Sequence, residues 1–256
     1  MILYPNAKIN IGLNIINKRS DGYHNIETLF YPIVGLSDIL EITEASQTSM
    51  KEYGIEFPGR PEENICLKAY TLLKEEFALP EVEINLYKKI PVGAGLGGGS
   101  SDGAHTILLL DTLFDLNLTD TQKMEFASRL GSDCPFFIRN RPMLGSGKGE
   151  ILRPFELNLD KYRIKLVTPP LFISTAEAYR GVVPREKREN VDNTPLSDLL
   201  KSPIEEWRGR ISNDFEETLL KKYPLLAECK ERLYREGALY ASMSGSGSTL
   251  YGIFKK

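Results

Sequence analysis

Residues 91–103 read PVGAGLGGGSSDG, and the fold prediction starts from this stretch. Six of the seven residues at 93–99 are glycine or alanine, with Leu96 as the exception. Glycine adopts positive φ and has no β-carbon, so successive backbone N–H groups can turn into a concave nest that binds anions. Ser100 or Ser101 is expected to cap the following helix, whose partial positive end then faces the same spot. The stretch therefore predicts a phosphate-binding loop.

The segments on either side of the loop support this interpretation. An alternating strand is predicted at 82–86, and a strongly apolar helix at 104–114. An isolated glycine-rich stretch is more often a flexible surface loop, but flexibility between two apolar elements would be costly. A dinucleotide fold is disfavoured because the repeating βαβ pattern and an acid about 20 residues further on are missing. The segment GSGKG at 145–149 lacks the Ser or Thr of a P-loop, so we interpret it as a hairpin turn.

Further from the loop, strands and helices mix without a regular βαβ rhythm, which favours an α+β fold over a doubly wound sheet. Asn64 is expected to open a helix and Gly131 to end one. The pair Cys134-Pro135 is expected to extend the chain, which places Asp133 at a loop corner before a strand. Other strands are predicted at 8–16, 28–42, 164–168, 239–243 and 250–254, and other helices at 121–130, around 179, at 214–222 and at 225–235.

Composition limits the possible partners and the compartment. The 256 residues carry a formal net charge of -3, so no overall field attracts nucleic acid or an anionic membrane. The three cysteines are widely spaced, which fits neither a disulfide framework nor a zinc site. The first residues lack a basic and then apolar signal, and no apolar run approaches the roughly 20 residues of a membrane helix. We expect a cytoplasmic protein with no nucleic-acid or membrane partner.

Three sequence segments, taken together, indicate a particular protein family. They are AKIN at 7–10, PVGAGLGGGSSD at 91–102 and MSGSGST at 243–249. Their order and spacing resemble the GHMP kinase superfamily. With SDGYHNIETLF at 20–30 and GSDCPFF at 131–137, the chain resembles the family in it that phosphorylates a cytidine diphosphate conjugate of methylerythritol in non-mevalonate isoprenoid biosynthesis.

This resemblance implies a two-domain α+β GHMP kinase fold with the active-site cleft between the domains, which we expect at 1–155 and 156–256. It implies transfer of the γ-phosphoryl of ATP to the 2-hydroxyl of the small-molecule substrate, with ATP and Mg²⁺ as cofactors. The ligands of Mg²⁺ stay unassigned, and the oligomeric state stays open between a monomer and a weak homodimer.

The resemblance places Lys8 and Asp133 at the catalytic positions of the family. An alcohol is a weak nucleophile, so a carboxylate within hydrogen-bond reach can orient it and accept its proton. A neighbouring lysine can keep that carboxylate ionised and stabilise the negative charge that develops. Without the resemblance, Asp133 would be interpreted as a turn residue and Lys8 as a solvated one.

For the substrate, the resemblance indicates Asn10, Tyr23, His24 and Tyr179. Tyr23 and Tyr179 are expected to sandwich the cytosine, which gains about 1–3 kcal/mol per stacked base. His24 is expected to hydrogen-bond the base edge, because a neutral imidazole offers one donor and one acceptor. The alternatives are a loop histidine without a role and a tyrosine packed in the core.

For ATP, the resemblance indicates Asn64 and Lys88 together with residues of the glycine-rich loop. The loop residues are Pro91, Gly93, Ala94, Gly95, Leu96, Gly97, Gly98, Gly99, Ser100 and Ser101. The chain departs from the family pattern at Asn6, Gly103, His105 and Cys134, none of which is a proposed catalytic position.

Two other functions remain as alternatives. The first is another GHMP kinase, for homoserine or a mevalonate, but Tyr23 and His24 argue against it because those substrates have no base. The second is a non-catalytic nucleotide-binding module, but Lys8 and Asp133 argue against it because a pure binder needs no acid at the acceptor.

Overall fold

The computed structural model describes residues 1–56, 59–188 and 194–256, and its contacts divide the chain into two compact units. The first unit comprises Met1–Lys8, Pro32–Val92 and Gly97–Arg141, and the second comprises Ile9–Tyr31, Gly93–Leu96 and Pro142–Lys256. Neither unit is one continuous segment, because the chain passes between them several times. The domain boundary expected at residue 155 stays a prediction. The two units do not divide at this residue, because the second unit has segments on both sides of it.

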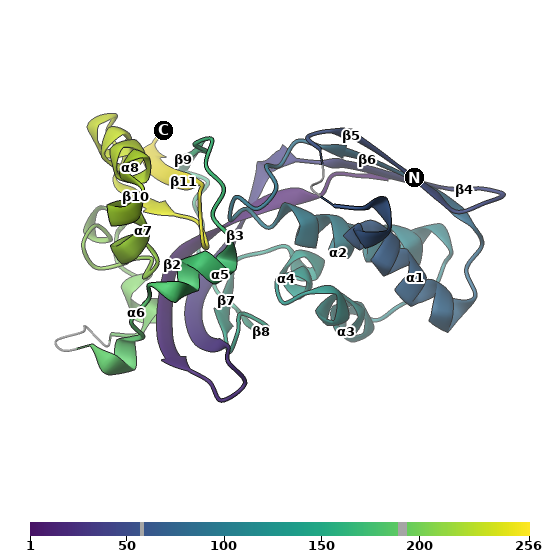
Figure 1. Ribbon diagram of the computed structural model, residues 1–256, viewed down its shortest axis with the longest axis horizontal. Coiled ribbons are helices and arrows are strands. Elements are labelled where there is room, and N and C mark those ends of the chain that lie inside the picture. Colours follow the sequence, from purple (N-terminus) through teal and green to yellow (C-terminus); the bar gives the residue numbers. More distant parts are fainter. Residues whose placement is uncertain (57–58, 189–193) are drawn as a thin grey trace. The chain divides into compact units, whose positions relative to one another are not determined.

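The first unit contains a four-stranded sheet in the order β1-β4-β6-β5. Its strands are β1 (Ile2–Leu3), β4 (Ile39–Glu44), β5 (Ser49–Gly54) and β6 (Val82–Lys88). β4 pairs antiparallel with β1 and β6, whereas β5 runs parallel to β6. Helices α1 (Ile65–Phe77) and α2 (Gly98–Leu113) lie along one face of this sheet (Figure 1), and α3 (Asp120–Leu130) and α4 (Cys134–Arg139) pack beside α2.

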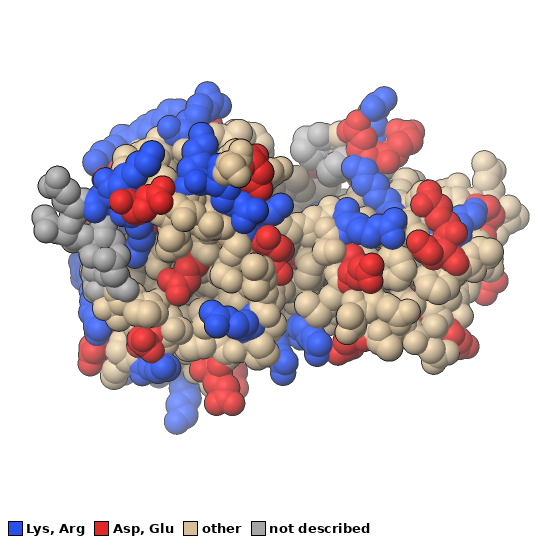
Figure 2. All heavy atoms as spheres, turned by 90° about the horizontal axis from the view of Figure 1, so that it is seen from below, with Lys and Arg blue, Asp and Glu red and all other residues tan. Residues whose placement is uncertain are grey.

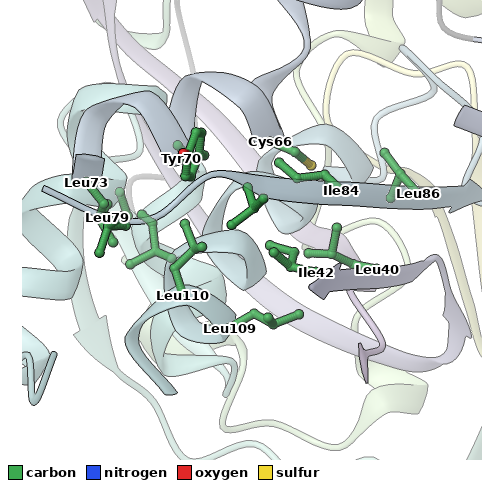
Figure 3. Close-up of a cluster of buried hydrophobic side chains, with 14 of the residues drawn as sticks. Leu40, Ile42, Cys66, Tyr70, Leu73, Leu79, Ile84, Leu86, Leu109 and Leu110 are labelled. Carbon is green, nitrogen blue, oxygen red and sulfur yellow. The ribbon is translucent and has the colours of Figure 1, made fainter. Parts of the chain in front are cut away.

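Alternation along the strands creates the core of the first unit. The buried apolar residues of β4 and β6 alternate along each strand, so they lie on one face of the sheet. The apolar face meets α1 and α2 (Figure 3), and each fully buried side chain of this kind contributes about 1.5–3 kcal/mol. The labelled members are Leu40, Ile42, Cys66, Tyr70, Leu73, Leu79, Ile84, Leu86, Leu109 and Leu110.

The second unit contains two antiparallel sheets. One has the order β2-β3-β7-β8 and the other β10-β11-β9. The strands are β2 (Asn6–Lys18), β3 (His24–Ser37), β7 (Met143–Ser146), β8 (Ile151–Pro154), β9 (Tyr162–Val167), β10 (Tyr240–Met243) and β11 (Leu250–Lys255), although residues 6–8 of β2 and 32–37 of β3 belong to the first unit. The helices are α5 (Thr175–Arg180), α6 (Leu196–Leu199), α7 (Glu216–Lys222) and α8 (Pro224–Arg235). Short 3-10 turns lie at Pro61–Glu63 in the first unit and at Arg185–Lys187 and Ile204–Glu206 in the second.

Several sequence predictions are confirmed by these elements. Asn64 caps α1, α3 ends at Gly131, Tyr179 lies in α5, and residues 147–150 form the turn between β7 and β8. The strand predicted after Asp133 is wrong, because α4 begins at Cys134. Pro135 lies in the first turn of that helix, where an N–H group would have no partner within the helix in any case.

The prediction that Ser100 or Ser101 caps the helix after the loop is also wrong. α2 begins at Gly98, earlier than the apolar pattern indicated, so both serines lie inside the helix. The residue before the helix is Gly97, which makes no side-chain capping bond.

Charges of both signs are interspersed on the surface that Figure 2 shows, in keeping with the net charge of -3. Among the described residues, no helix combines the length and the apolar character that crossing a bilayer requires.

Candidate functional site

The glycine-rich loop requires glycine at three positions. Gly93, Gly95 and Gly97 have φ values of 67°, 79° and 70°, which other residues rarely adopt. A β-carbon on Gly95 would lie 2.1 Å from the carbonyl oxygen of Ser244. One on Gly97 would lie 3.0 Å from the side chain of Lys8 and 3.0 Å from the ring of Phe137. The loop is therefore a tightly packed structure and not a flexible surface segment.

The loop leads into the N-terminus of α2, a helix of 16 residues. The N–H groups of its first turn have no partner within the helix and carry the positive end of the helix dipole. Gly97 leaves this end free of a side-chain cap, and a β-carbon on Gly99 would meet nothing within 4 Å. Backbone donors and open space next to them fit the oxygens of a phosphate.

Lys8 connects this helix end with Asp133. Its side chain is only 5% exposed and lies against Gly97. Its Nζ is 3.5 Å from Oδ2 of Asp133, a side chain that is 30% exposed at the start of α4. Thus the structure brings together the two predicted catalytic residues, at the end of the predicted phosphate loop.

The predicted base-binding residues lie in the second unit. The rings of His24 and Tyr179 stack with centroids 4.7 Å apart and planes at 15°, and Tyr179 meets Phe215 edge to face. Burial, with a smaller contribution from Lys18, lowers the pKa of His24 below its ordinary value. Tyr23 is 61% exposed, and Nζ of Lys148 lies 4.8 Å from its ring centroid. The observed stacked pair is thus His24 with Tyr179, and the sandwich of Tyr23 and Tyr179 stays a prediction.

Asn10 is held by the segment at 242–249, which contains the third family motif. The backbone N–H of Asn10 donates to Oγ of Ser244 at 3.1 Å, and its Nδ2 donates to Oγ1 of Thr28 at 3.1 Å. Oγ of Ser244 donates in turn to the carbonyl oxygen of Gly95 at 2.8 Å, and the N–H of Thr249 donates to the carbonyl oxygen of Ala94. The predicted substrate residue Asn10 and the middle of the glycine-rich loop therefore share one scaffold.

Asn64 and Lys88, predicted to line the nucleotide pocket, have their polar ends engaged within the protein. Asn64 caps α1 by accepting from the N–H of Cys66 at 2.9 Å, and its Nδ2 donates to Glu52 at 2.5 Å. Lys88 is buried between Asp38 and Asp102. Their predicted contact with the nucleotide stays a prediction.

The two carboxylates around Lys88 were missed by sequence reasoning. Asp38 is flanked by the apolar residues of VGLSDILEI, where a charged side chain is unexpected. Asp102 lies in the GSSDG segment, on the buried side of α2. The available signal was a charged residue within an apolar stretch of sequence. Such a signal does not show which residue the charged side chain pairs with.

No group of three or more His, Cys, Asp or Glu side chains that could hold a metal occurs in the described parts of the chain. A cavity of about 410 Å³ opens in the second unit beside β2, β3 and β7, but none of the predicted site residues lines it.

Comparisons with known proteins agree with this geometry. The model of the GHMP kinases N terminal domain matches residues 64–141, and that of the GHMP kinases C terminal domain matches residues 196–256. The 4-diphosphocytidyl-2-C-methyl-D-erythritol kinase of Azobacteroides pseudotrichonymphae is 51% identical, with 100% of this chain and 94% of the relative covered. The protein of the same name from Bacteroides thetaiotaomicron is 48% identical, with 100% and 92% covered.

Solved structures lead to the same family. A crystal structure of 4-(cytidine 5'-diphospho)-2C-methyl-D-erythritol kinase has a TM-score of 0.81 and 32% identity, with 99% of this chain and 90% of that chain covered. The mevalonate kinase of Methanococcus jannaschii, at 15% identity and a TM-score of 0.69, shares the fold. With both GHMP kinase domain matches and full-length relatives at about half identity, this chain belongs to the 4-diphosphocytidyl-2-C-methyl-D-erythritol kinase family of the GHMP kinases.

Proposed function

We propose that this protein transfers the γ-phosphoryl of ATP to the 2-hydroxyl of 4-diphosphocytidyl-2-C-methyl-D-erythritol, a step in the non-mevalonate formation of isoprenoid precursors. One observation carries the proposal: the side chain of Lys8 contacts Gly97 at the end of the phosphate loop, and its Nζ pairs with Asp133. A protein that only binds a nucleotide needs no carboxylate at this place, whereas a kinase needs one beside the acceptor hydroxyl.

In the proposed reaction, the hydroxyl oxygen attacks the γ-phosphorus while the bond from that phosphorus to the β–γ bridging oxygen breaks and ADP leaves. Phosphoryl transfer needs alignment of donor and acceptor and positive charge near the phosphoryl oxygens more than it needs covalent help. Asp133 orients the hydroxyl and accepts its proton. Lys8 stabilises the negative charge, and the N–H groups at the start of α2 hold the phosphates.

The aromatic residues supply the preference for a cytidine conjugate. His24 and Tyr179 already form a flat stacked surface, and Tyr23 offers a further exposed ring. Planar surfaces of this kind bind a base by stacking. Homoserine and mevalonate contain no base, so a related kinase for either of them would have no use for these rings.

The cofactor assignments rest on the glycine-rich loop and its surroundings. ATP fits the loop through residues 91–101, and Asn64 and Lys88 support that pocket. Mg²⁺, when bound with ATP, neutralises phosphate charge, and in such sites it commonly keeps several waters and few protein ligands. We assign no residue to it. We further propose that the protein works in the cytoplasm, because its three cysteines are free and buried, and that it does so without nucleic-acid partners, as a monomer or weak homodimer.

The test is a coupled assay of ADP release with Mg-ATP and each of four acceptors: the cytidine conjugate, methylerythritol without the cytidine diphosphate, mevalonate and homoserine. We expect turnover with the cytidine conjugate and very poor turnover with the other three. Phosphorus NMR of the product should show a new phosphate monoester. Faster turnover of mevalonate or homoserine would replace the proposed substrate, and ATP binding without turnover of any acceptor would favour a non-catalytic module.

A further inference from the structure

Three ionisable side chains are buried together behind the phosphate loop. Lys88, the last residue of β6, is 5% exposed, and its Nζ donates to Oδ2 of Asp38 and, at 2.6 Å, to Oδ2 of Asp102. The Asp38 side chain is fully buried and that of Asp102 is 3% exposed. Buried polar and charged groups are costly unless they are paired, so separating these three side chains from one another is unfavourable. Pairing within this group of three, which we call the triad, therefore restricts the relative positions of the chain segments that carry Asp38, Lys88 and Asp102.

Two of these segments adjoin the ends of the phosphate loop, and the third, which carries Asp38, binds one of those ends. Asp38 accepts hydrogen bonds from the N–H groups of Lys89 at 2.5 Å and of Ile90 at 2.8 Å, directly before the loop begins at Pro91. Asp102 lies in the second turn of α2, directly after the loop. Lys88 binds both carboxylates and thereby connects the beginning of the loop with the helix at its end.

Packing between the two ends reinforces this connection. A β-carbon on Gly98, the first residue of α2, would lie 2.8 Å from Cγ2 of Ile90 and 3.4 Å from Nζ of Lys88. The helix end can approach the end of β6 this closely only because position 98 is glycine. A displacement of Lys88 would therefore disturb the packing at the first residue of α2.

We propose that Asp38, Lys88 and Asp102 are positioning residues that set the two ends of the phosphate loop, and that Lys88 acts on ATP through the loop instead of through contact with the nucleotide. This inference rests on the proposed kinase function, because it assumes that ATP binds at the loop. It changes the role expected for Lys88 and gives a function to the two carboxylates.

The triad also has a distinctive charge state. Burial raises the pKa of Asp102 to about 8, and Oδ1 of Asp102 has no hydrogen-bond partner among the residues that the structure describes. The charged groups that face Asp102 are Lys88 on β6 and Asp38 at the start of β4; the Cys66 thiol on α1 is nearby, and its pKa is raised by burial to a range where it stays protonated. His105, one turn further along α2, is kept neutral because burial lowers its pKa. Above about pH 8, Asp102 therefore adds a buried negative charge close to the positive end of α2, where it opposes the binding of an anion.

The experiment measures the dissociation constant of Mg-ATP by calorimetry without acceptor, between about pH 7.5 and pH 9.5, where the phosphates of ATP are fully ionised. Wild type should bind ATP at least threefold more weakly at the upper end. Asp102→Asn keeps an oxygen that accepts a hydrogen bond from Lys88, but the asparagine side chain cannot ionise. The affinity of this variant for Mg-ATP should therefore lie within twofold of wild type at pH 7.5 and stay constant with pH. Lys89→Met removes an exposed neighbouring lysine and serves as the matched control, with a wild-type profile.

A second variant tests the connection itself. Asp102→Leu removes the acceptor for Lys88, so ATP should bind at least tenfold more weakly, while kcat at saturating ATP should change less than threefold. If Lys88 instead bound the phosphates directly, loss of the competing carboxylate would leave ATP affinity unchanged or increase it, and that result overturns the proposal. Should Asp102→Leu fail to fold, the Asp102→Asn profile decides: the same alkaline weakening as in wild type overturns the proposal.

These outcomes are separable from failure of the proposed function. If wild type binds ATP but phosphorylates no cytidine conjugate, the substrate proposal falls while the binding profiles still decide on the triad. If wild type binds no ATP, both proposals fall.

Discussion

The imidazole of His24 lies flat against the ring of Tyr179, with centroids 4.7 Å apart and an angle of 15° between the planes. Tyr179 also packs edge to face with Phe215, at a centroid distance of 4.9 Å. Because the second ring is fixed by packing, the stacked pair presents a preformed planar surface and does not have to be ordered when a base binds. A cytosine can bind by extending this stack.

Replacing Tyr179 tests whether this surface binds the base. Tyr179→Ala should raise KM for the cytidine substrate by an amount equivalent to about 1–3 kcal/mol, the usual effect of losing a stacked aromatic. KM for ATP should change less than twofold, since the phosphate loop is untouched. Tyr179→Phe keeps the ring and is the control. An equal rise in both KM values would place the tyrosine outside the base site.

The protonation of His24 gives a pH test of the same site. Burial and Lys18 hold the pKa of His24 below its ordinary value, near 6.5. The imidazole is therefore neutral at neutral pH and becomes charged only in more acidic solution. KM for the cytidine substrate should be constant from about pH 7 upward and rise only below about pH 6.5. His24→Gln keeps a donor and an acceptor without the titration. If the acidic rise in KM persists in this variant, it originates elsewhere.

The Asp133 carboxylate should matter for turnover and little for ATP binding. Asp133→Asn should lower kcat by about 10²–10⁴-fold, the usual contribution of a positioned general base. KM for ATP should stay within a few-fold of wild type. Asp120→Asn, which changes an exposed aspartate paired with Arg139, is the control and should retain wild-type kinetics. An Asp133→Asn enzyme that keeps most of its kcat would remove this residue from the mechanism.

Two glycines of the loop should respond differently to alanine. In Gly97→Ala the new β-carbon meets Lys8 and Phe137 at 3.0 Å, and the positive φ of 70° is strained, so both stability and kcat should fall. In Gly99→Ala the β-carbon meets no protein atom within 4 Å, so the melting temperature should stay within about 2 °C of wild type. If ATP nevertheless binds at least fivefold more weakly to Gly99→Ala, the ligand itself occupies that space. Unchanged affinity would remove Gly99 from the phosphate site.

Asp102→Asn should also make the protein more stable, with a pH dependence whose sign is fixed. The pKa of Asp102 is about 8 in the folded protein, against about 3.9 when unfolded. Between these values the folded state keeps a proton that the unfolded state has lost, so the free energy of unfolding falls as pH rises. In Asp102→Asn, this fall in the free energy of unfolding is absent, because asparagine does not ionise. Its advantage in melting temperature should grow from about pH 5 to pH 8, by about 2–4 °C for each kcal/mol. A constant difference across this window would contradict the raised pKa.

Local sequence signals predicted the elements that depend on neighbouring residues. The glycines of 93–99 predicted a loop with positive φ, and Asn64 predicted a helix start, because both features depend on conformational preferences of a few consecutive residues. The prediction that Cys134-Pro135 extends the chain was wrong, although it too was based on the conformational preferences of consecutive residues. A proline is compatible with an extended segment and with the first turn of a helix, and local preference does not distinguish them.

The sequence by itself thus predicted a glycine-rich loop, most of the regular elements and, through the family motifs, Lys8 and Asp133 as the candidate catalytic pair. Only the tertiary structure decided which charges meet. Lys88 lies 50 positions from Asp38 and 14 from Asp102, yet the three side chains share one buried site. It also decided that His24 stacks on Tyr179, which lies 155 positions further along the chain. Such partners are selected by burial, because a charge or ring removed from water must find its complement wherever the fold places one, whatever the separation along the chain.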